Sequence, residues 1–205
     1  MVVTTNRDPP NSPSGATVIG WGMAEVSGRD LVRQSFRWVD GHADVWRLFS
    51  DAKVFATVID GIVAPWRTAG ITMIAGIESR GFLLGGASAI ALRVGFVAIR
   101  KEGGLLPGMK HTADTGIDYR GRRHRLRMQR TLRPTDRVLL VDDWVEKGSQ
   151  ASAARELVEA SGATFAGLSV IVDQLDSAAK QMVAPVTALV TATELGPPSA
   201  PAGKV

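Results

Sequence analysis

Four short apolar runs, bounded by glycine or by charged residues, divide the middle of the chain. They lie at residues 71–76, 95–100, 136–143 and 165–173. The apolar residues within each run are continuous and do not alternate with polar ones. This pattern predicts strands that are buried on both faces of a sheet.

The segments around these strands have helical patterns. Apolar residues recur at helical spacing from 51 to 66, and residues 83–93 are rich in Ala and Leu. Residues 150–161 carry an apolar face that ends at Gly162. Strands that alternate with helices predict an α/β fold, with a mostly parallel twisted sheet flanked by helices.

Residues 102–118 hold four glycines, a proline and few apolar residues, so they predict a long loop. The next segment, 119–129, alternates weakly and predicts a hairpin or ribbon. In open parallel sheets, ligands bind beyond the carboxyl ends of the strands. Polar residues follow the predicted strands at 78–80, 100–101 and 142–148, so we expect the functional site there.

Both ends of the chain have the composition of linkers. Residues 1–15 predict a flexible lead and residues 196–205 a flexible tail, because both are rich in Pro, Gly and Ser. Residues 16–195 have a length that suits a single domain. The lead has no apolar signal region, and no apolar run approaches the ~20 residues of a membrane span. We therefore expect a cytoplasmic protein with no membrane partner.

The composition excludes several chemistries. There is no cysteine and the three histidines (His42, His111 and His124) are scattered, so we expect neither disulfides nor a His/Cys metal site. The net charge is +4, yet seven arginines and no acid lie between Arg120 and Arg133. Such a stretch serves a polyanionic ligand or a nucleic acid, or it is the solvated face of a strand.

The segment VLLVDDWVEKGSQ (138–150) joins two carboxylates to the start of a helix. The apolar strand delivers Asp142 and Asp143 to the edge of the sheet, and the loop through Gly148 opens into a helix whose unpaired N–H groups favour a phosphate. Carboxylates beside a phosphate suit ribose hydroxyls or magnesium-bound water. The residues alone leave a second interpretation open, in which the two acids only end a strand.

Two segments carry a resemblance to a known family. VLLVDD, with its glycine-containing loop and Ala-rich helix, resembles the motif by which type I phosphoribosyltransferases bind phosphoribosyl pyrophosphate (PRPP). The stretch IAGIESRGFLLGGASAIALRVGFVAIRKEGGLLPG (74–108) is similar to adenine phosphoribosyltransferases in particular. The matched segments cover about residues 71–173, so the resemblance implies a phosphoribosyltransferase fold. It also implies a small amino-terminal hood within residues 16–50.

The resemblance implies a loop that binds pyrophosphate through backbone amides and through Arg80, which acts in catalysis. The Glu78–Ser79 peptide of this loop is expected to be cis. The expected pyrophosphate contacts are Glu78, Ser79, Arg80, Gly81, Arg100 and Lys101, the last two acting within their own subunit or on a neighbouring one. A plainer interpretation makes Arg80 a surface ion-pair residue and places Arg100 and Lys101 at an ordinary charged strand end.

Residues 102–118 match the mobile lid of the family, which closes over PRPP. Asp118 aligns with a glutamate there that assists the nitrogen of the base, so Asp118 is the second predicted catalytic residue. Aspartate is one methylene shorter than glutamate. In the plainer interpretation Asp118 is a turn residue after Gly116.

The PRPP loop departs from the family pattern, because Glu146-Lys147-Gly148-Ser149-Gln150 replaces Ala-Thr-Gly-Gly-Thr. Two threonine hydroxyls are lost, while Ser149 keeps a hydroxyl and Lys147 adds a charge. The expected PRPP contacts are Asp142, Asp143, Lys147, Gly148, Ser149 and Gln150. Trp144 replaces a small aliphatic residue, and it either packs or stacks on a ligand.

The hood departs further from the family. Only a faint likeness remains in SFRWVDGHADVW (35–46), where Ala43, Asp44 and Val45 take the place of the residues expected to bind the base.

The resemblance implies a Mg²⁺-dependent pentosyltransferase that transfers phosphoribose from PRPP to a purine-type base, most simply adenine, and acts as a homodimer. Mg²⁺ would be carried by PRPP, without a direct protein ligand. The alternative is a non-catalytic regulatory protein that binds PRPP or a nucleotide on the same fold. A nucleic-acid partner for the arginine stretch is not expected, because no nucleic-acid-binding module precedes it.

Overall fold

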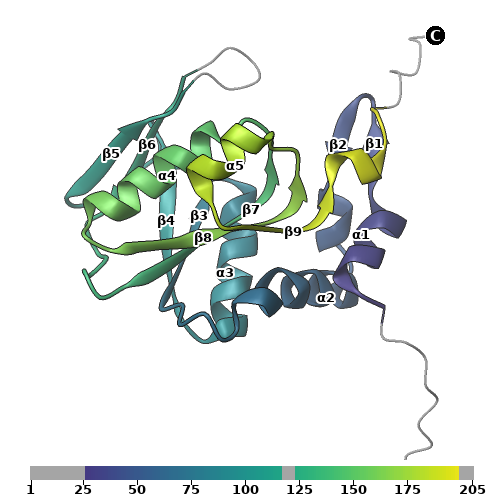
Figure 1. Cartoon of the computed structure of the whole chain (residues 1–205), viewed down its shortest axis with the longest axis horizontal. Helices are drawn as coiled ribbons and strands as arrows, with labels where there is room; N and C mark the ends of the chain where they lie inside the picture. The colour runs from purple at the N-terminus through teal and green to yellow at the C-terminus, as the bar shows by residue number, and fades with distance from the viewer. Residues whose placement is uncertain (1–25, 117–122, 199–205) are drawn as a thin grey trace, which may run out of the picture.

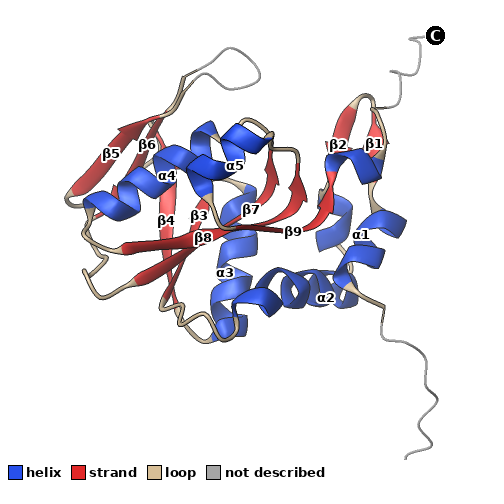
Figure 2. Cartoon of the chain, in the orientation of Figure 1, coloured by secondary structure: helices blue, strands red, loops and turns tan. Residues whose placement is uncertain are grey.

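The computed structural model describes residues 26–116 and 123–198. These residues form a seven-stranded sheet in the order β5-β6-β4-β3-β7-β8-β9, with helices on both faces (Figures 1 and 2). The strands are β3 (Met73–Ile77), β4 (Gly95–Lys101), β5 (Lys110–Asp114), β6 (Arg125–Gln129), β7 (Arg137–Val145), β8 (Thr164–Asp173) and β9 (Val186–Thr191). Strands β4, β3, β7, β8 and β9 are parallel, and β5 and β6 add an antiparallel hairpin at one edge.

The helices cover the sheet as two separate layers. Helices α2 (Ala52–Val63) and α3 (Arg80–Leu92) pack on one face, whereas α4 (Ser149–Ala160) and α5 (Ser177–Val183) pack on the other (Figure 2). Strand β7 contributes to both cores: Leu139 and Val141 belong to the core on the α2–α3 face, and Val138 and Leu140 to the core on the α4 face. This two-sided burial explains why the apolar runs are continuous.

The amino-terminal residues of the described chain form a small hood beside the sheet (Figure 1). It consists of α1 (Gly28–Ser35), the hairpin of β1 (Arg37–Val39) and β2 (His42–Asp44), and a 3₁₀ turn, η1 (Trp46–Phe49). The ring of Trp38 lies 5.8 Å from the ring of Trp144. The Trp38 indole donates to the Gly196 carbonyl, 3.2 Å away, just after the 3₁₀ turn η3 (Ala192–Leu195). The hood is therefore held against β7 by aromatic contacts.

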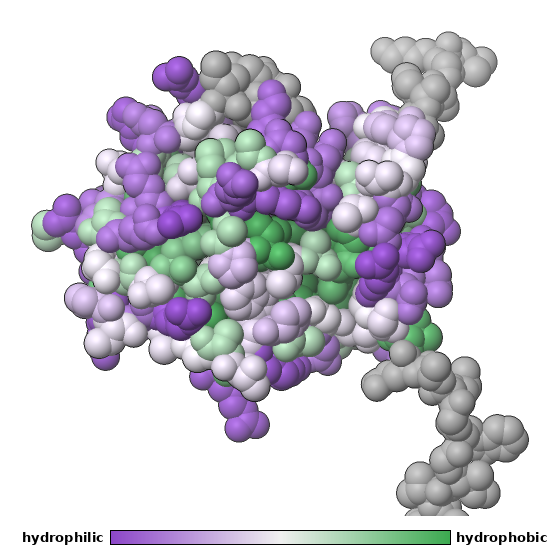
Figure 3. Space-filling view, viewed as in Figure 1, coloured by the Kyte–Doolittle hydropathy of each residue, from purple (hydrophilic) through white to green (hydrophobic). Residues whose placement is uncertain are grey.

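The order of the strands creates a topological switch point at β3, where the chain connections run to opposite sides of the sheet. From β3 the chain passes through α3 to β4 on one side, and β7 pairs with β3 on the other side. The carboxyl ends of β3 and β7 therefore border a crevice, which is where open α/β sheets bind ligands. Figure 3 shows the α4–α5 face, where apolar residues gather across the middle over β8 and β9 and charged residues border them.

The predicted α/β fold with its mostly parallel sheet is confirmed. The long loop predicted at 102–118 is wrong in part, because residues 110–114 pair with β6 and form β5. The helix predicted from Leu83 begins at Arg80, so Arg80 belongs to the first turn of α3.

The flexible lead lies outside the described residues, as does the predicted tail beyond Pro198, and the single-domain assignment stays a prediction. Among the helices of the described chain, none has the length and apolar character needed to span a membrane.

Candidate active site

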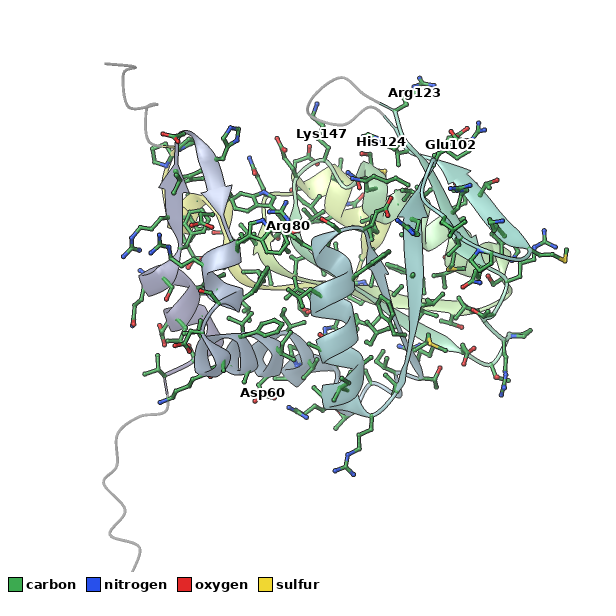
Figure 4. All side chains as sticks on the ribbon, turned by 180° about the vertical axis from the view of Figure 1, so that it is seen from behind. Asp60, Arg80, Glu102, Arg123, His124 and Lys147 are labelled. Atoms are coloured by element: carbon green, nitrogen blue, oxygen red, sulfur yellow. The ribbon has the colours of Figure 1, made fainter. Side chains whose placement is uncertain are left out.

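A cleft of about 890 Å³ opens at the switch point. Its walls are the carboxyl ends of β3 and β7, the amino terminus of α4 and the β1–β2 hairpin of the hood. In Figure 4, His124 and Lys147 lie near the top of the view, Arg80 lies below them nearer the centre, and Asp60 lies at the bottom. The predicted site residues on the cleft wall are Ala43, Glu78, Ser79, Arg80, Lys101, Asp142, Asp143, Lys147, Gly148, Ser149 and Gln150.

The two acids of β7 form the floor of the cleft together with Arg80. Asp143 is 5% exposed, and its Oδ2 lies 3.1 Å from Nη1 of Arg80. The backbone N–H of Asp143 donates to Oδ1 of Asp142 over 2.9 Å. The expectation that both acids sit at the open edge of the sheet is wrong for Asp143, because β7 continues to Val145 and encloses it.

The surroundings of Asp142 alter the ionisation of its carboxyl group. Burial raises the pKa of Asp142 well above its usual value, and the neighbouring charge of Asp143 raises it further. Arg80 acts in the opposite direction and lowers the pKa of Asp142. Paired acids in a crevice whose charge depends on a neighbouring cation are typical of functional sites.

The turn between β3 and α3 brings its backbone to the acid pair. The Glu78–Ser79 peptide is cis, which the resemblance implies. Gly81 packs against Asp142, since a Cβ at Gly81 would lie 3.2 Å from Oδ1 of that residue. The first N–H groups of α3 therefore lie beside the carboxylates, together with Arg80.

The loop before α4 offers its amides to the cleft. Gly148 caps α4 with φ of 69°, in the left-handed region that favours glycine, and it provides no side-chain cap. The first N–H groups of α4 are thus available to an anion. Glu146 and Lys147 form no ion pair with each other or with any other residue that the structure describes.

The hood residues that were expected to bind the base divide into three environments. Ala43 lines the cleft. Asp44 instead binds Arg47, with Oδ2 3.5 Å from Nε, and the side chain of Val45 is fully buried in the core. Of the three, only Ala43 therefore lies at the site. The other predicted catalytic residue, Asp118, lies outside the described residues.

The cleft is also lined by residues that the sequence reasoning did not select for the site, and Trp38, His124 and Gln174 are among them. Gln174 directly follows β8, so its place at the carboxyl end of a predicted strand was a usable signal. Its Oε1 accepts the indole N–H of Trp144 over 2.8 Å. Trp144 also packs on Phe36, with ring centroids 6.2 Å apart, which agrees with the packing interpretation for this residue.

Two arginines of this stretch, both on β6, bind neighbouring segments of the chain. Arg125 binds Asp114, with Nε 2.7 Å from Oδ1. Arg127 donates from Nη2 to the Gly104 carbonyl over 2.5 Å. For Arg125, which is exposed, the solvated-strand interpretation is closer to the structure than that of a nucleic-acid surface, whereas the Nε of Arg127 is buried.

Curated proteins of similar sequence are adenine phosphoribosyltransferases. One from Maricaulis maris is 42% identical over 130 residues, which is 63% of this chain and 73% of that protein. One from Bradyrhizobium sp. (strain BTAi1) is 38% identical over 151 residues, which is 72% of this chain and 83% of that protein. This chain belongs to the adenine phosphoribosyltransferase family. No protein-family model matches the chain.

Solved structures of the family share the fold. The enzyme from Giardia lamblia, in complex with 9-deazaadenine, has a TM-score of 0.72 at 29% identity and covers 82% of this chain and 98% of its own. The Saccharomyces cerevisiae enzyme, in complex with an iminoaltritol bisphosphate and adenine, has a TM-score of 0.70 at 28% identity and covers 79% of this chain and 98% of its own. The fold shared with these enzymes therefore covers most of this chain.

Proposed function

We propose that this protein transfers the 5-phosphoribosyl group of PRPP to adenine, giving AMP and pyrophosphate. One observation carries the proposal. In a chain of this family, the Asp142–Asp143 pair, the Arg80 partner of Asp143 and the amino terminus of α4 line one cleft. This arrangement supplies acceptors for ribose hydroxyls and donors for phosphates within one cleft.

The parts of the cleft suit the parts of PRPP. Asp142 and Asp143 accept hydrogen bonds from the ribose hydroxyls. The amides of α4, with Ser149, Gln150 and Lys147, hold the 5′-phosphate. Gly41 and Ala43 of the hood, with Trp38 and Trp144, form the remaining wall, where the base would lie.

The reaction forms a bond from a base nitrogen to C1 of the ribose and breaks the bond from C1 to the pyrophosphate oxygen. The base gives up one proton, and the electron pair of the broken bond leaves with the pyrophosphate. Arg80, Lys101 and the amides at Glu78–Gly81 stabilise the negative charge that develops on that group. We assign Asp118 as the residue that assists the base, from its alignment with the family.

The donor set fits Mg²⁺ that is carried by PRPP. No group of three or more His, Cys, Asp or Glu side chains with metal-ligand geometry occurs in the described ranges. Mg²⁺ usually keeps several waters when it is bound with substrate phosphates, and Asp142 and Asp143 would accept hydrogen bonds from ribose hydroxyls or from such waters. When bound, the ion neutralises charge on the leaving pyrophosphate.

We also propose a homodimer in the cytoplasm. Three large apolar side chains on α3 and β4 are exposed: Leu83 by 40%, Ile90 by 81% and Phe96 by 38%. Apolar residues that gather on one face of a protein are typical of a protein–protein interface. Sedimentation of the protein and of Ile90→Glu tests this assignment, since we expect the variant to be a monomer.

A pyrophosphate-release assay with PRPP, Mg²⁺ and a panel of bases tests the proposed reaction. We expect turnover with adenine, and no release when either PRPP or the base is omitted. PRPP binding by calorimetry without turnover on any base would overturn the enzyme and favour the non-catalytic regulatory protein.

A further inference from the structure

Two tryptophans form the side of the cleft that faces the hood, one from the hood and one from the end of β7. The ring of Trp38 lies 5.8 Å from the ring of Trp144, at an angle of 63°, and both residues line the cleft. The indole N–H of Trp38 donates to the Gly196 carbonyl over 3.2 Å, and that of Trp144 donates to Oε1 of Gln174 over 2.8 Å. Both indole donors therefore bind protein atoms, and the rings offer apolar surface to a ligand.

Gln174 lies beside these rings on a segment that is fixed at several points. Its backbone N–H donates to the Val145 carbonyl over 2.9 Å, which joins the end of β8 to the end of β7. The next residue, Leu175, donates its backbone N–H to Oδ1 of Asp173 over 2.8 Å. A Cβ at Gly148 would lie 3.2 Å from Cδ2 of Leu175. Contacts with the sheet and with the PRPP loop therefore set the position of residue 174.

The bond to Trp144 also decides how the side-chain amide of Gln174 is turned. An indole N–H can only donate, so the atom of Gln174 that faces it must be the oxygen. The Nε2 group then points away from the indole with two N–H donors. Gln174 is exposed and lines the cleft, and within residues 26–116 and 123–198 no acceptor of the protein binds its Nε2 group. A ligand in the cleft can take up this donor.

An exposed glutamine at the end of a strand is most simply a solvated residue. Gln174 differs because its amide is already held in one orientation by Trp144. A bond from a held side chain to a ligand costs less conformational entropy than one from a mobile side chain. The family motif has a small aliphatic residue at the position of Trp144, and such a residue cannot hold an amide. The oriented donor is therefore a feature of this chain.

We propose that Gln174 determines specificity for the base, by donating a hydrogen bond from Nε2 to an acceptor nitrogen of the purine ring. Trp38 and Trp144 contact the base through their apolar rings, and Trp144 also positions the amide of Gln174. Adenine offers N1, N3 and N7 as acceptors when N9 carries the ribose. This inference rests on the proposed function, because that proposal assigns the base to this wall of the cleft.

Calorimetric titration with AMP and with ribose 5-phosphate tests the proposal without any reaction. The two ligands share the ribose and the phosphate, and only AMP carries the base. We expect Gln174→Leu to weaken the binding of AMP about tenfold, the upper range for one neutral hydrogen bond, and to leave the affinity for ribose 5-phosphate unchanged. An equal loss for both ligands, or an unchanged affinity for AMP, would overturn the proposal.

Two more variants separate hydrogen-bond donation from packing. Gln174→Glu keeps the shape and an acceptor for Trp144 but loses both N–H donors, so it should weaken AMP relative to ribose 5-phosphate as much as Gln174→Leu does. Trp144→Phe keeps an aromatic ring but loses the indole N–H, so it should also weaken AMP, because the amide is no longer held. Full affinity for AMP in Gln174→Glu would overturn the role of the donor. Additive losses in Trp144→Phe combined with Gln174→Leu would overturn the positioning by Trp144.

Analogues of AMP locate the acceptor of this bond. The 1-, 3- and 7-deaza forms each replace one ring nitrogen with carbon, so each lacks one acceptor. With one of the three, Gln174→Leu should cause no further loss of affinity, since the bond is already absent. With the other two it should cause the same loss as with AMP. A loss of that size with all three analogues would overturn the proposed bond.

Gln181→Leu and Trp46→Phe are the matched controls. Gln181 is exposed on α5, and Trp46 is 55% exposed on the hood, with its ring 5.7 Å from that of Phe49. Neither residue lines the described part of the cleft. Both variants should therefore keep the affinities of the unmodified protein for AMP and for ribose 5-phosphate.

The outcomes distinguish this inference from the proposed function. If the unmodified protein released no pyrophosphate with any base, the proposed reaction would fail, and the AMP titrations would still decide the role of Gln174. If the unmodified protein bound AMP no more tightly than ribose 5-phosphate, the wall would not bind the base. The inference would then fail even if adenine were turned over.

Discussion

Nη1 of Arg80 and Oδ2 of Asp143 lie 3.1 Å apart across the gap between the start of α3 and the end of β7. The side chain of Asp143 is 6% exposed and that of Arg80 is 34% exposed. The carboxylate is therefore buried, while the arginine is partly accessible from the cleft. In the free protein the arginine therefore compensates a buried carboxylate. In the function proposed above, its remaining N–H groups stabilise the pyrophosphate.

Replacement of Arg80 should affect both turnover and stability. We expect Arg80→Ala to raise the barrier of transfer by about 2–4 kcal/mol, the range for the loss of one donor to a developing anion. It should also lower the free energy of unfolding, because Asp143 loses its cation. Turnover at saturating PRPP and urea denaturation measure the two effects.

Arg67→Ala is the matched control for Arg80→Ala. Its ion pair with Asp60 is exposed, by 49% and 67%, and exposed pairs contribute little. Unchanged turnover in Arg80→Ala would assign Arg80 to the surface ion-pair interpretation instead.

The acid pair should be required for binding. We expect Asp142→Asn with Asp143→Asn to abolish PRPP binding in calorimetric titration, because two carboxylate acceptors become amides. Asparagine has nearly the same shape and keeps a carbonyl acceptor for the N–H of residue 143, so circular dichroism should show an intact fold. Unchanged PRPP affinity would remove the two acids from the site.

The single change Asp142→Asn should stabilise the free protein in a manner that depends on pH. Burial raises the pKa of Asp142 in the folded state. Ionisation of this carboxyl above its ordinary pKa therefore costs folding free energy, and the cost grows with pH until the folded pKa is reached. We expect the variant to gain free energy of unfolding at pH 7 and to lose this gain toward pH ~4, where unfolded Asp becomes protonated.

Urea unfolding of both proteins between these pH values measures the difference. Asp60→Asn is the control, since Asp60 is an exposed residue on the other side of the molecule. A stability gain that does not vary with pH would show that the ionisation of Asp142 is not its cause.

The altered phosphate loop should reduce the affinity for PRPP below that of a family-type loop. Each lost threonine hydroxyl would have contributed a charge-assisted hydrogen bond of roughly 1.5–3 kcal/mol. We expect Lys147→Thr, Ser149→Gly and Gln150→Thr together to tighten PRPP in calorimetry. Gly148 stays unchanged in this variant, because its φ of 69° strains any other residue.

A tenfold loss of affinity in the triple variant would contradict the expectation. It would indicate that Lys147 and Gln150 are adapted to another phosphorylated ligand. Gly86→Ala serves as the control, because a Cβ at Gly86 would meet nothing within 4 Å, and it should leave the affinity for PRPP unchanged.

The sequence by itself determined the parallel strands and the location of the site. Buried parallel strands are continuous apolar runs, and the carboxyl ends of such strands meet at one edge of the sheet, so the positions of Asp142, Asp143 and the 146–150 loop follow from local pattern. The family motifs also placed Arg80 beside the Glu78–Ser79 turn.

Only the tertiary structure decided which of these residues face the cleft. Lys101 does and Arg100 does not, because the register of β4 with β3 and β6 sets the direction of each side chain. Strand β5 exists through its pairing with β6, and Val45 is in the core through contacts distant in sequence. Such long-range pairings produce no periodic pattern of apolar residues along the sequence, whereas individual strands and helices do.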